Sequence, residues 1–221
     1  MFDHDNIFFY LWGYAVSYLE FFGMISGAVA IALSAFANVW NWIIGIVNVV
    51  LSLLLFYQVQ LYPDMFLQVF FLVTNVIGFW RWTHPDKLEE GRKHELRISR
   101  LTAKQITYGV IAGVLGTSLM GTFAGKLHHL IPQLFTLPSA YPYLDSFVTV
   151  MSIIGTFYAI NKKIESWLVW LPVDAVAAYL YFMRDIWLYA VLYLVFLLIA
   201  AFALFNWWRE YRSYNVSGAR A

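Results

Sequence analysis

The chain has 221 residues, of which 62% are hydrophobic and only 12% are charged, whereas ordinary soluble domains carry about 25% charged residues. This composition excludes a soluble domain. The absence of cysteine excludes disulfide bonds and thiolate metal sites, and the net charge of +1 is uninformative about partners.

The first 18 residues precede the long hydrophobic runs. Asp3 and Asp5 stand before an aromatic stretch, whereas a cleavable signal peptide would begin with a basic segment. We therefore expect residues 1–18 to be retained as a periplasmic segment that forms an interfacial helix.

The hydrophobic residues that follow come in separated runs of about 20, the length that an α-helix needs to cross about 30 Å of hydrocarbon. They predict an all-α integral membrane protein with seven transmembrane helices, at residues 19–36, 38–60, 64–82, 104–124, 143–161, 164–183 and 186–208. Two longer connections, 83–100 and 125–142, divide these helices into groups of three, one and three. We expect a first three-helix repeat at 19–83 and a second at 143–209. Residues 84–142 between them comprise a cytoplasmic loop, a linker helix and an outer loop, and residues 210–221 form a cytoplasmic tail.

Lys and Arg predict the orientation, because these residues are retained on the cytoplasmic side. Residues 81–104 hold seven of the 14 Lys and Arg residues. If this stretch is cytoplasmic, alternation of seven spans leaves only Lys126 and Arg184 outside. The N-terminus is therefore expected outside and the C-terminus in the cytoplasm.

Residues 19–82 match residues 144–207 without a gap at a constant offset of 125 positions. The coincident pairs are Leu19 and Leu144, Phe22 and Phe147, Trp42 and Trp167, Leu55 and Leu180, Leu67 and Leu192, Leu72 and Leu197, Trp82 and Trp207, with the acidic pair Glu20 and Asp145. Such internal similarity is typical of transporters built from repeats. Because one spanning helix separates the two repeats, they are expected to run parallel.

Polar side chains within the predicted spans are the best candidates for a binding site, since a polar group at bilayer depth usually faces a cavity or a partner helix. They recur at helical spacing on one face of three helices. The candidates are Asn41, Asn48, Gln68, Asn75, Trp167, Trp170 and Asp174. Asp174 is the only acid expected at mid-membrane.

A packing role is the alternative for each of these residues. Asn and Gln also join helices by interhelical hydrogen bonds, typically worth about 0.6 kcal/mol. Taken alone, Asp174 is equally consistent with a buried structural acid that is hydrogen-bonded to a neighbouring hydroxyl or amide. For the amides taken together, we favour a binding cavity.

Catalytic signals are absent. There is no His-Glu-x-x-His stretch and no Walker-type phosphate loop, and His128 and His129 are adjacent, a spacing that does not suit chelation of one ion. A membrane aspartyl protease would need two mid-membrane acids. We therefore expect no enzyme, no catalytic residues, no metal, no cofactor and no direct pumping by ATP.

Several segments together resemble the bacterial nicotinamide riboside transporters of the PnuC family, which share a three-one-three helix plan with the SWEET sugar transporters. The resemblance covers most of the chain from Glu20 onward. Its specific positions are Asn48-Val49, residues 56–62 including Gln58, residues 67–71, Asn75, Gly78, Asp145-Ser146, Glu165 and the Trp167-x-x-Trp170 pair.

The resemblance implies a carrier in the bacterial inner membrane that moves nicotinamide riboside by facilitated diffusion and alternating access. A cytoplasmic kinase would trap the cargo by phosphorylation. The residues implied to line the central cavity are Asn41, Asn48, Gln58, Gln68, Asn75, Trp167, Trp170 and Asp174. Amides suit a carboxamide and ribose hydroxyls, and Trp170 with Asp174 suits the cationic ring. The partners are this substrate, the lipid bilayer and the kinase; nucleic acid is not expected, and a homo-oligomer stays open.

One departure concerns Asp174, where the family is expected to carry an amide more often. It leaves open another nucleoside, a thiamine-like vitamin, or a sugar carried in the SWEET manner. A seven-helix sorting receptor is a further alternative. Recognition of a peptide carboxylate would call for Arg or Lys within the membrane, whereas the predicted spans carry Arg81 and Lys104 only at their cytoplasmic ends.

Overall fold

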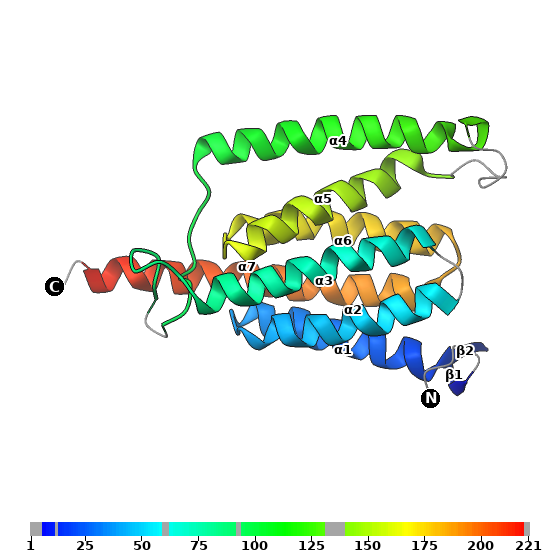
Figure 1. Cartoon of the computed structure of the whole chain (residues 1–221), viewed down its shortest axis with the longest axis horizontal. Helices are drawn as coiled ribbons and strands as arrows, with labels where there is room; N and C mark the ends of the chain where they lie inside the picture. Colours follow the sequence, from blue (N-terminus) through cyan, green and yellow to red (C-terminus); the bar gives the residue numbers. More distant parts are fainter. Residues whose placement is uncertain (1–5, 12, 59–61, 92–93, 131–139, 219–221) are drawn as a thin grey trace. The chain divides into compact units, whose positions relative to one another are not determined.

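A computed structural model describes residues 6–11, 13–58, 62–91, 94–130 and 140–218. These residues form seven helices, which confirms the predicted number (Figure 1). The helices are α1 (Tyr18–Ala35), α2 (Trp40–Gln58), α3 (Tyr62–Thr83), α4 (Ala103–Leu130), α5 (Pro142–Ile160), α6 (Glu165–Met183) and α7 (Trp187–Gly218). The chain divides into two compact units, Met1–Arg97 and Ile98–Ala221.

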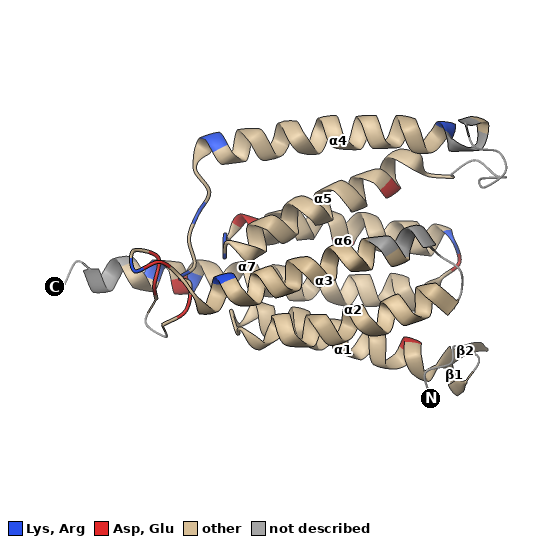
Figure 2. Ribbon diagram, viewed as in Figure 1, with Lys and Arg blue, Asp and Glu red and all other residues tan. Residues whose placement is uncertain are grey.

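Among the described residues, six helices are long and apolar enough to cross a membrane, and α3 is not one of these six. With 22 residues α3 has the necessary length, but it carries Gln68, Thr74 and Asn75 in its interior. Charged residues gather in the connections and near the ends of the helices (Figure 2). Asp174 departs from this pattern, because it lies near the middle of α6.

The segment before α1 is a two-stranded antiparallel hairpin, so the predicted interfacial helix is wrong for these residues. Strand β1 is Ile7–Leu11 and β2 is Tyr14–Ser17. Aromatic and β-branched residues favour strands, and Gly13 adopts a φ of 84°, which a tight connection between strands requires. Asp3 and Asp5 lie outside the described residues.

Two helices are longer than predicted. Helix α4 continues to Leu130, and α7 continues through the expected tail to Gly218. Hydrophobic runs locate only the part of a helix that lies in lipid, whereas a helix can continue in water where polar neighbours one turn apart support it. In α7 the Tyr214 hydroxyl donates to the Glu210 carboxylate at 2.7 Å.

Each unit contains one middle helix that packs against two others. In the first unit α2 packs against α1 and α3, and in the second α6 packs against α5 and α7, while α4 packs against α5. Each unit also contains an edge-to-face tryptophan pair. The ring centroids of Trp42 and Trp82 are 5.4 Å apart at 89°, and those of Trp167 and Trp207 are 5.6 Å apart at 88°. These pairs correspond at the offset of 125.

The turns before the two middle helices match in the same way. Ala37 and Lys162 correspond at the offset, and both adopt a positive φ, 53° and 50°. The next residues also form equivalent backbone bonds: Asn38 N–H donates to Leu33 C=O at 3.0 Å, and Lys163 N–H donates to Tyr158 C=O at 2.9 Å. The correspondence of backbone and side-chain geometry supports two repeats of one three-helix plan.

Candidate functional site

Asn48 joins two helices of the first unit. Its Nδ2 donates to the Gly23 carbonyl oxygen on α1 at 2.7 Å and lies 3.5 Å from Ser26 Oγ. A Cβ added to Gly27 would lie 3.1 Å from Asn48 Nδ2, so the glycine leaves the amide its space. These contacts with α1 support a packing role for Asn48.

Asn75 occupies the other side of α2. Its Nδ2 donates to the Phe71 carbonyl oxygen of its own helix at 2.7 Å, and its Oδ1 lies against Gly45. A Cβ at Gly45 would lie 2.2 Å from that oxygen. The polar face predicted along α2 is therefore divided, because Asn48 contacts α1 and Gly45 receives a side chain from α3.

The other predicted amides have different settings. Asn41 is buried, and its Nδ2 donates to the Asn38 carbonyl oxygen at 2.6 Å, in the turn just before α2. Gln68 is half-buried on α3, and Gln58 is half-buried at the end of α2. Asn41 thus supports the turn, while the long side chain of Gln68 stays available for another role.

The two predicted tryptophans of α6 differ in their surroundings. Trp167 is buried in its pair with Trp207, so it has the same packing position as Trp42 in the first unit. Trp170 is half-buried, and its Cε2 and Nε1 atoms lie 3.2 Å from where a Cβ of Gly155 on α5 would be. Of the two rings, Trp170 is the better placed to meet a ligand.

Asp174 is 5% exposed and lies within electrostatic range of one tyrosine of α7, Tyr193. The Tyr193 ring stacks on Tyr181, with centroids 5.3 Å apart at 17°, and Tyr181 stacks on Tyr189 at 5.3 Å and 27°. These three tyrosines were not among the predicted site residues. The repeat contained a signal for one of them, because Tyr193 corresponds to Gln68 at the offset of 125.

Each unit therefore offers a different chemistry on the same scaffold. The first provides the amides Asn48, Gln68 and Asn75, and the second provides aromatic faces with one carboxylate. Pro172, between Trp170 and Asp174, interrupts the hydrogen bonding of α6, because proline has no N–H to donate to the preceding turn. Within the described residues there is no cluster of three His, Asp or Glu side chains that could hold a metal ion. The arrangement suits hydrogen bonding and aromatic contact with a ligand.

Comparison with known proteins gives consistent matches. A family model described as nicotinamide mononucleotide transporter matches residues 17–209. The nicotinamide riboside transporter PnuC of Escherichia coli (strain K12) is 26% identical over 203 residues, covering 85% of this chain and 84% of that protein. The riboflavin/roseoflavin transporter RibM of Streptomyces davaonensis is 21% identical over 206 residues, covering 92% of this chain and 91% of that protein.

A solved structure has the same fold. The crystal structure of the vitamin B3 transporter PnuC superimposes with a TM-score of 0.67 and 23% sequence identity, covering 89% of this chain and 83% of that chain. The predicted likeness is therefore confirmed both in sequence and in fold.

Proposed function

Since the chain belongs to the PnuC family of nicotinamide riboside transporters and is a membrane transporter, we propose that its cargo is nicotinamide riboside. The observation that carries the proposal is the nicotinamide riboside transporter PnuC, a relative that covers 85% of the chain. It lies in the same family, whose model matches residues 17–209. The chemistry of the candidate residues supports the same cargo.

Nicotinamide riboside has a cationic pyridinium ring, a carboxamide and a ribose. The ring suits Trp170 and Tyr193, because an aromatic face attracts a desolvated cation by about 2 kcal/mol and a carboxylate such as Asp174 adds to this attraction. The carboxamide and hydroxyl groups suit amides such as Gln68. We assign substrate binding to Gln68, Trp170, Asp174 and Tyr193, with Asn48, Asn75, Asn41, Gln58 and Trp167 as further predicted members.

Transport proceeds in this proposal by facilitated diffusion. The two three-helix repeats alternate between opening to the outside and opening to the cytoplasm, and the cargo passes through a central polar and aromatic cavity. Pro172 removes a backbone hydrogen bond from α6 between Trp170 and Asp174, so the helix can bend there. A cytoplasmic kinase then adds a phosphate, and the added charge prevents return through the apolar membrane. Net uptake needs no coupled ion.

Riboflavin is a second candidate cargo, because the RibM relative covers 92% of the chain. Riboflavin has a neutral ring system. A buried carboxylate costs free energy unless an opposite charge or hydrogen bonds compensate it, so Asp174 favours a cationic cargo over a neutral one. Thiamine, another cationic aromatic vitamin, also satisfies this condition.

Uptake of labelled vitamins into proteoliposomes tests the proposal. Nicotinamide riboside is expected to enter, and to compete better than thiamine or riboflavin. In Asp174→Asn the KM for nicotinamide riboside is expected to rise at least about tenfold, because an interaction with a charged group is typically worth about 1.5–3 kcal/mol. A faster uptake of riboflavin than of nicotinamide riboside by the unaltered protein would overturn the assignment.

Asp185→Asn is the matched control. This acid is exposed in the turn between α6 and α7, and the substitution removes the same charge outside the site. Its KM is expected to stay unchanged. An equal rise in both variants would mean that the net charge of the protein, rather than Asp174, attracts the cation.

A further inference from the structure

The turn before α6 is covered by an extended stretch of its own unit. Ser99 N–H donates to the Lys162 carbonyl oxygen at 3.1 Å, and Ser99 C=O accepts from Ile164 N–H at 3.0 Å. One amide donor and one carbonyl acceptor from Ser99 thus satisfy the Lys162 C=O and Ile164 N–H groups of this turn, in the manner of a parallel β-bridge.

The equivalent groups in the first unit are the Ala37 carbonyl oxygen and the Val39 N–H, at the offset of 125. The two turns share their backbone conformation, as the positive φ values of Ala37 and Lys162 indicate. Among the described residues, neither of these two groups in the first unit has a hydrogen-bond partner. The same binding edge is therefore present in both units and is occupied in the second.

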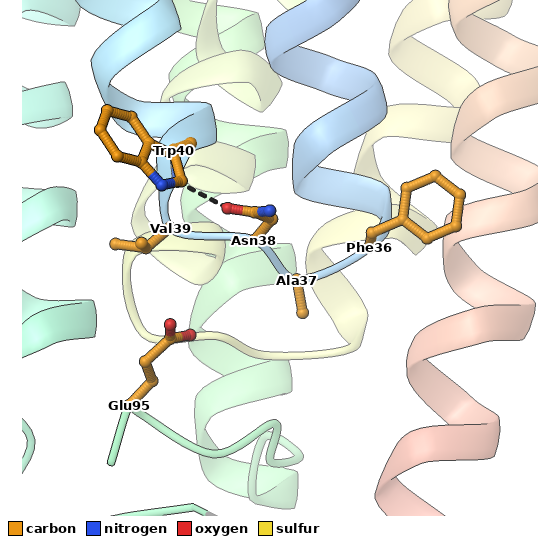
Figure 3. A pocket seen from close by; sticks show the side chains of 6 residues that line it. All are labelled: Phe36, Ala37, Asn38, Val39, Trp40 and Glu95. Carbon is orange, nitrogen blue, oxygen red and sulfur yellow. Dashed lines mark hydrogen bonds between the residues drawn. The ribbon is translucent and has the colours of Figure 1, made fainter. Parts of the chain in front are cut away.

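A cavity of about 470 Å³ lies at this edge of the first unit, lined by Phe36, Ala37, Asn38, Val39, Trp40 and Glu95 (Figure 3). This volume falls in the range of small-molecule sites, about 300–1,000 Å³. Figure 3 shows the Glu95 carboxylate directed from its loop toward the turn. Phe36 and Trp40, at the two ends of the turn, are 59% and 61% exposed.

We infer that this cavity is a second binding site for the transported cation, in which the carboxamide takes the place that the N–H and C=O groups of Ser99 have in the second unit. The inference rests on the proposed function. A primary carboxamide carries a donor and an acceptor on one carbon, so it satisfies Ala37 C=O and Val39 N–H together. Glu95 and Trp40 then face a positively charged aromatic ring, which both kinds of group attract.

The site distinguishes nicotinamide riboside from nicotinic acid riboside. The acid replaces the amide with a carboxylate, which has no hydrogen to donate to Ala37 C=O and brings a negative charge beside Glu95. The count of Lys and Arg assigns this turn to the cytoplasmic side. There the site would hold cargo close to the inner mouth of the carrier after release.

The amide resonance of Val39 tests the inference directly. The full chain, labelled with ¹⁵N-valine in detergent, is titrated with nicotinamide riboside, and the Val39 resonance is identified by its loss in Val39→Ala. It is expected to shift and to saturate. In Glu95→Gln the apparent Kd is expected to rise about fivefold, the effect of losing a partly exposed charge pair. Nicotinic acid riboside is expected to bind there at least tenfold more weakly than the amide.

Glu90→Gln is the matched control, because Glu90 lies in the same loop but does not line the cavity. Its Kd at Val39 is expected to equal that of the unaltered protein. If nicotinamide riboside is taken up into proteoliposomes while the Val39 resonance does not move, the second site is refuted and the proposed function stands. If there is no uptake, the proposed function itself fails.

Two further results would overturn the site. Equal binding of nicotinic acid riboside would exclude recognition through the carboxamide. Slow hydrogen exchange of the Val39 amide without ligand would mean that a segment of protein already occupies the edge, as Ser99 does in the second unit.

Discussion

At the scale of single residues, the indole N–H groups of Trp42 and Trp167 are the two equivalent buried donors that have no partner among the described residues. A buried donor without a partner costs free energy, so hydrogen bonding does not explain why tryptophan occupies these two positions. The fit of the ring shapes in each packed pair explains it. Trp82 and Trp207, the second members of the pairs, are 0% exposed.

Gly78→Ala is expected to disturb the pair in the first unit. A Cβ at Gly78 would lie 2.6 Å from three ring atoms of Trp42, so the ring would have to move. Overpacking of this kind typically costs about 1–3 kcal/mol. Thermal unfolding of the detergent-solubilised protein is expected to show a lower Tm.

Gly23→Ala is the control for this substitution. A Cβ at Gly23 would meet no atom within 4 Å, and its carbonyl oxygen, which Asn48 uses, is retained. This variant is expected to keep the Tm of the unaltered protein. Equal Tm values for the two glycine variants would refute the close packing of Trp42 against α3.

At the scale of elements, the junction of the hairpin with α1 is tied by one acidic side chain. Ser17 caps the helix by accepting from Glu20 N–H at 3.2 Å, and Glu20 accepts in return from Ser17 N–H at 2.9 Å. The Tyr14 hydroxyl donates to the other oxygen of Glu20 at 2.8 Å. This reciprocal capping sets where α1 begins and holds strand β2 against it.

The pKa of Tyr14 is raised to about 12, first by burial and then by its hydrogen bond to Glu20 and the charge of that group. The folded hairpin therefore favours the protonated phenol. The resulting stabilisation is complete below the ordinary phenol pKa of about 10 and is lost as the pH rises through about 12. The difference in phenolate absorbance between the unaltered protein and Tyr14→Phe is expected to show a transition near pH 12.

In Glu20→Gln the same transition is expected at a lower pH, because the amide keeps a hydrogen-bond acceptor but removes the negative charge. A transition at the same pH in both proteins would mean that burial alone shifts Tyr14, and that Glu20 does not hold the hairpin.

At the scale of the whole molecule, the repeat and the orientation can be tested with one set of variants, because the chain has no cysteine. Single cysteines at Tyr10, Asn38, Asn161 and Ser213 replace exposed residues in the hairpin, in the two corresponding turns and in the extension of α7. In intact cells, a membrane-impermeant maleimide is expected to label only position 10. The other three are expected to react after permeabilisation.

Labelling of positions 38 and 161 from opposite sides would contradict the parallel arrangement, since it would mean an inverted repeat. Labelling of positions 10 and 213 from the same side would contradict an odd number of spans. The unaltered protein, which has no thiol, gives the background.

The candidate site was predictable in part. Helical spacing located Asp174, Trp170 and the amides on their helices, because the positions of side chains around one helix follow from its period. Spacing did not show that Asn48 contacts α1 while Gly45 receives Asn75, because the choice of neighbour depends on how three helices pack. Tyr193 and the two tyrosines stacked with it were missed because aromatic residues at membrane interfaces are common and their spacing does not distinguish them.

The sequence by itself determined that this protein lies in a membrane and has seven helices, and it predicted that one three-helix plan is repeated at an offset of 125. Length, hydrophobicity and periodicity are properties of the chain alone, and they constrain any structure that must satisfy its backbone within lipid. Only the tertiary structure decided that residues 7–17 pair as a hairpin, that Trp167 packs against Trp207, and that no described residue of the first unit covers the backbone edge that Ser99 covers in the second. Those outcomes depend on which segments meet in space.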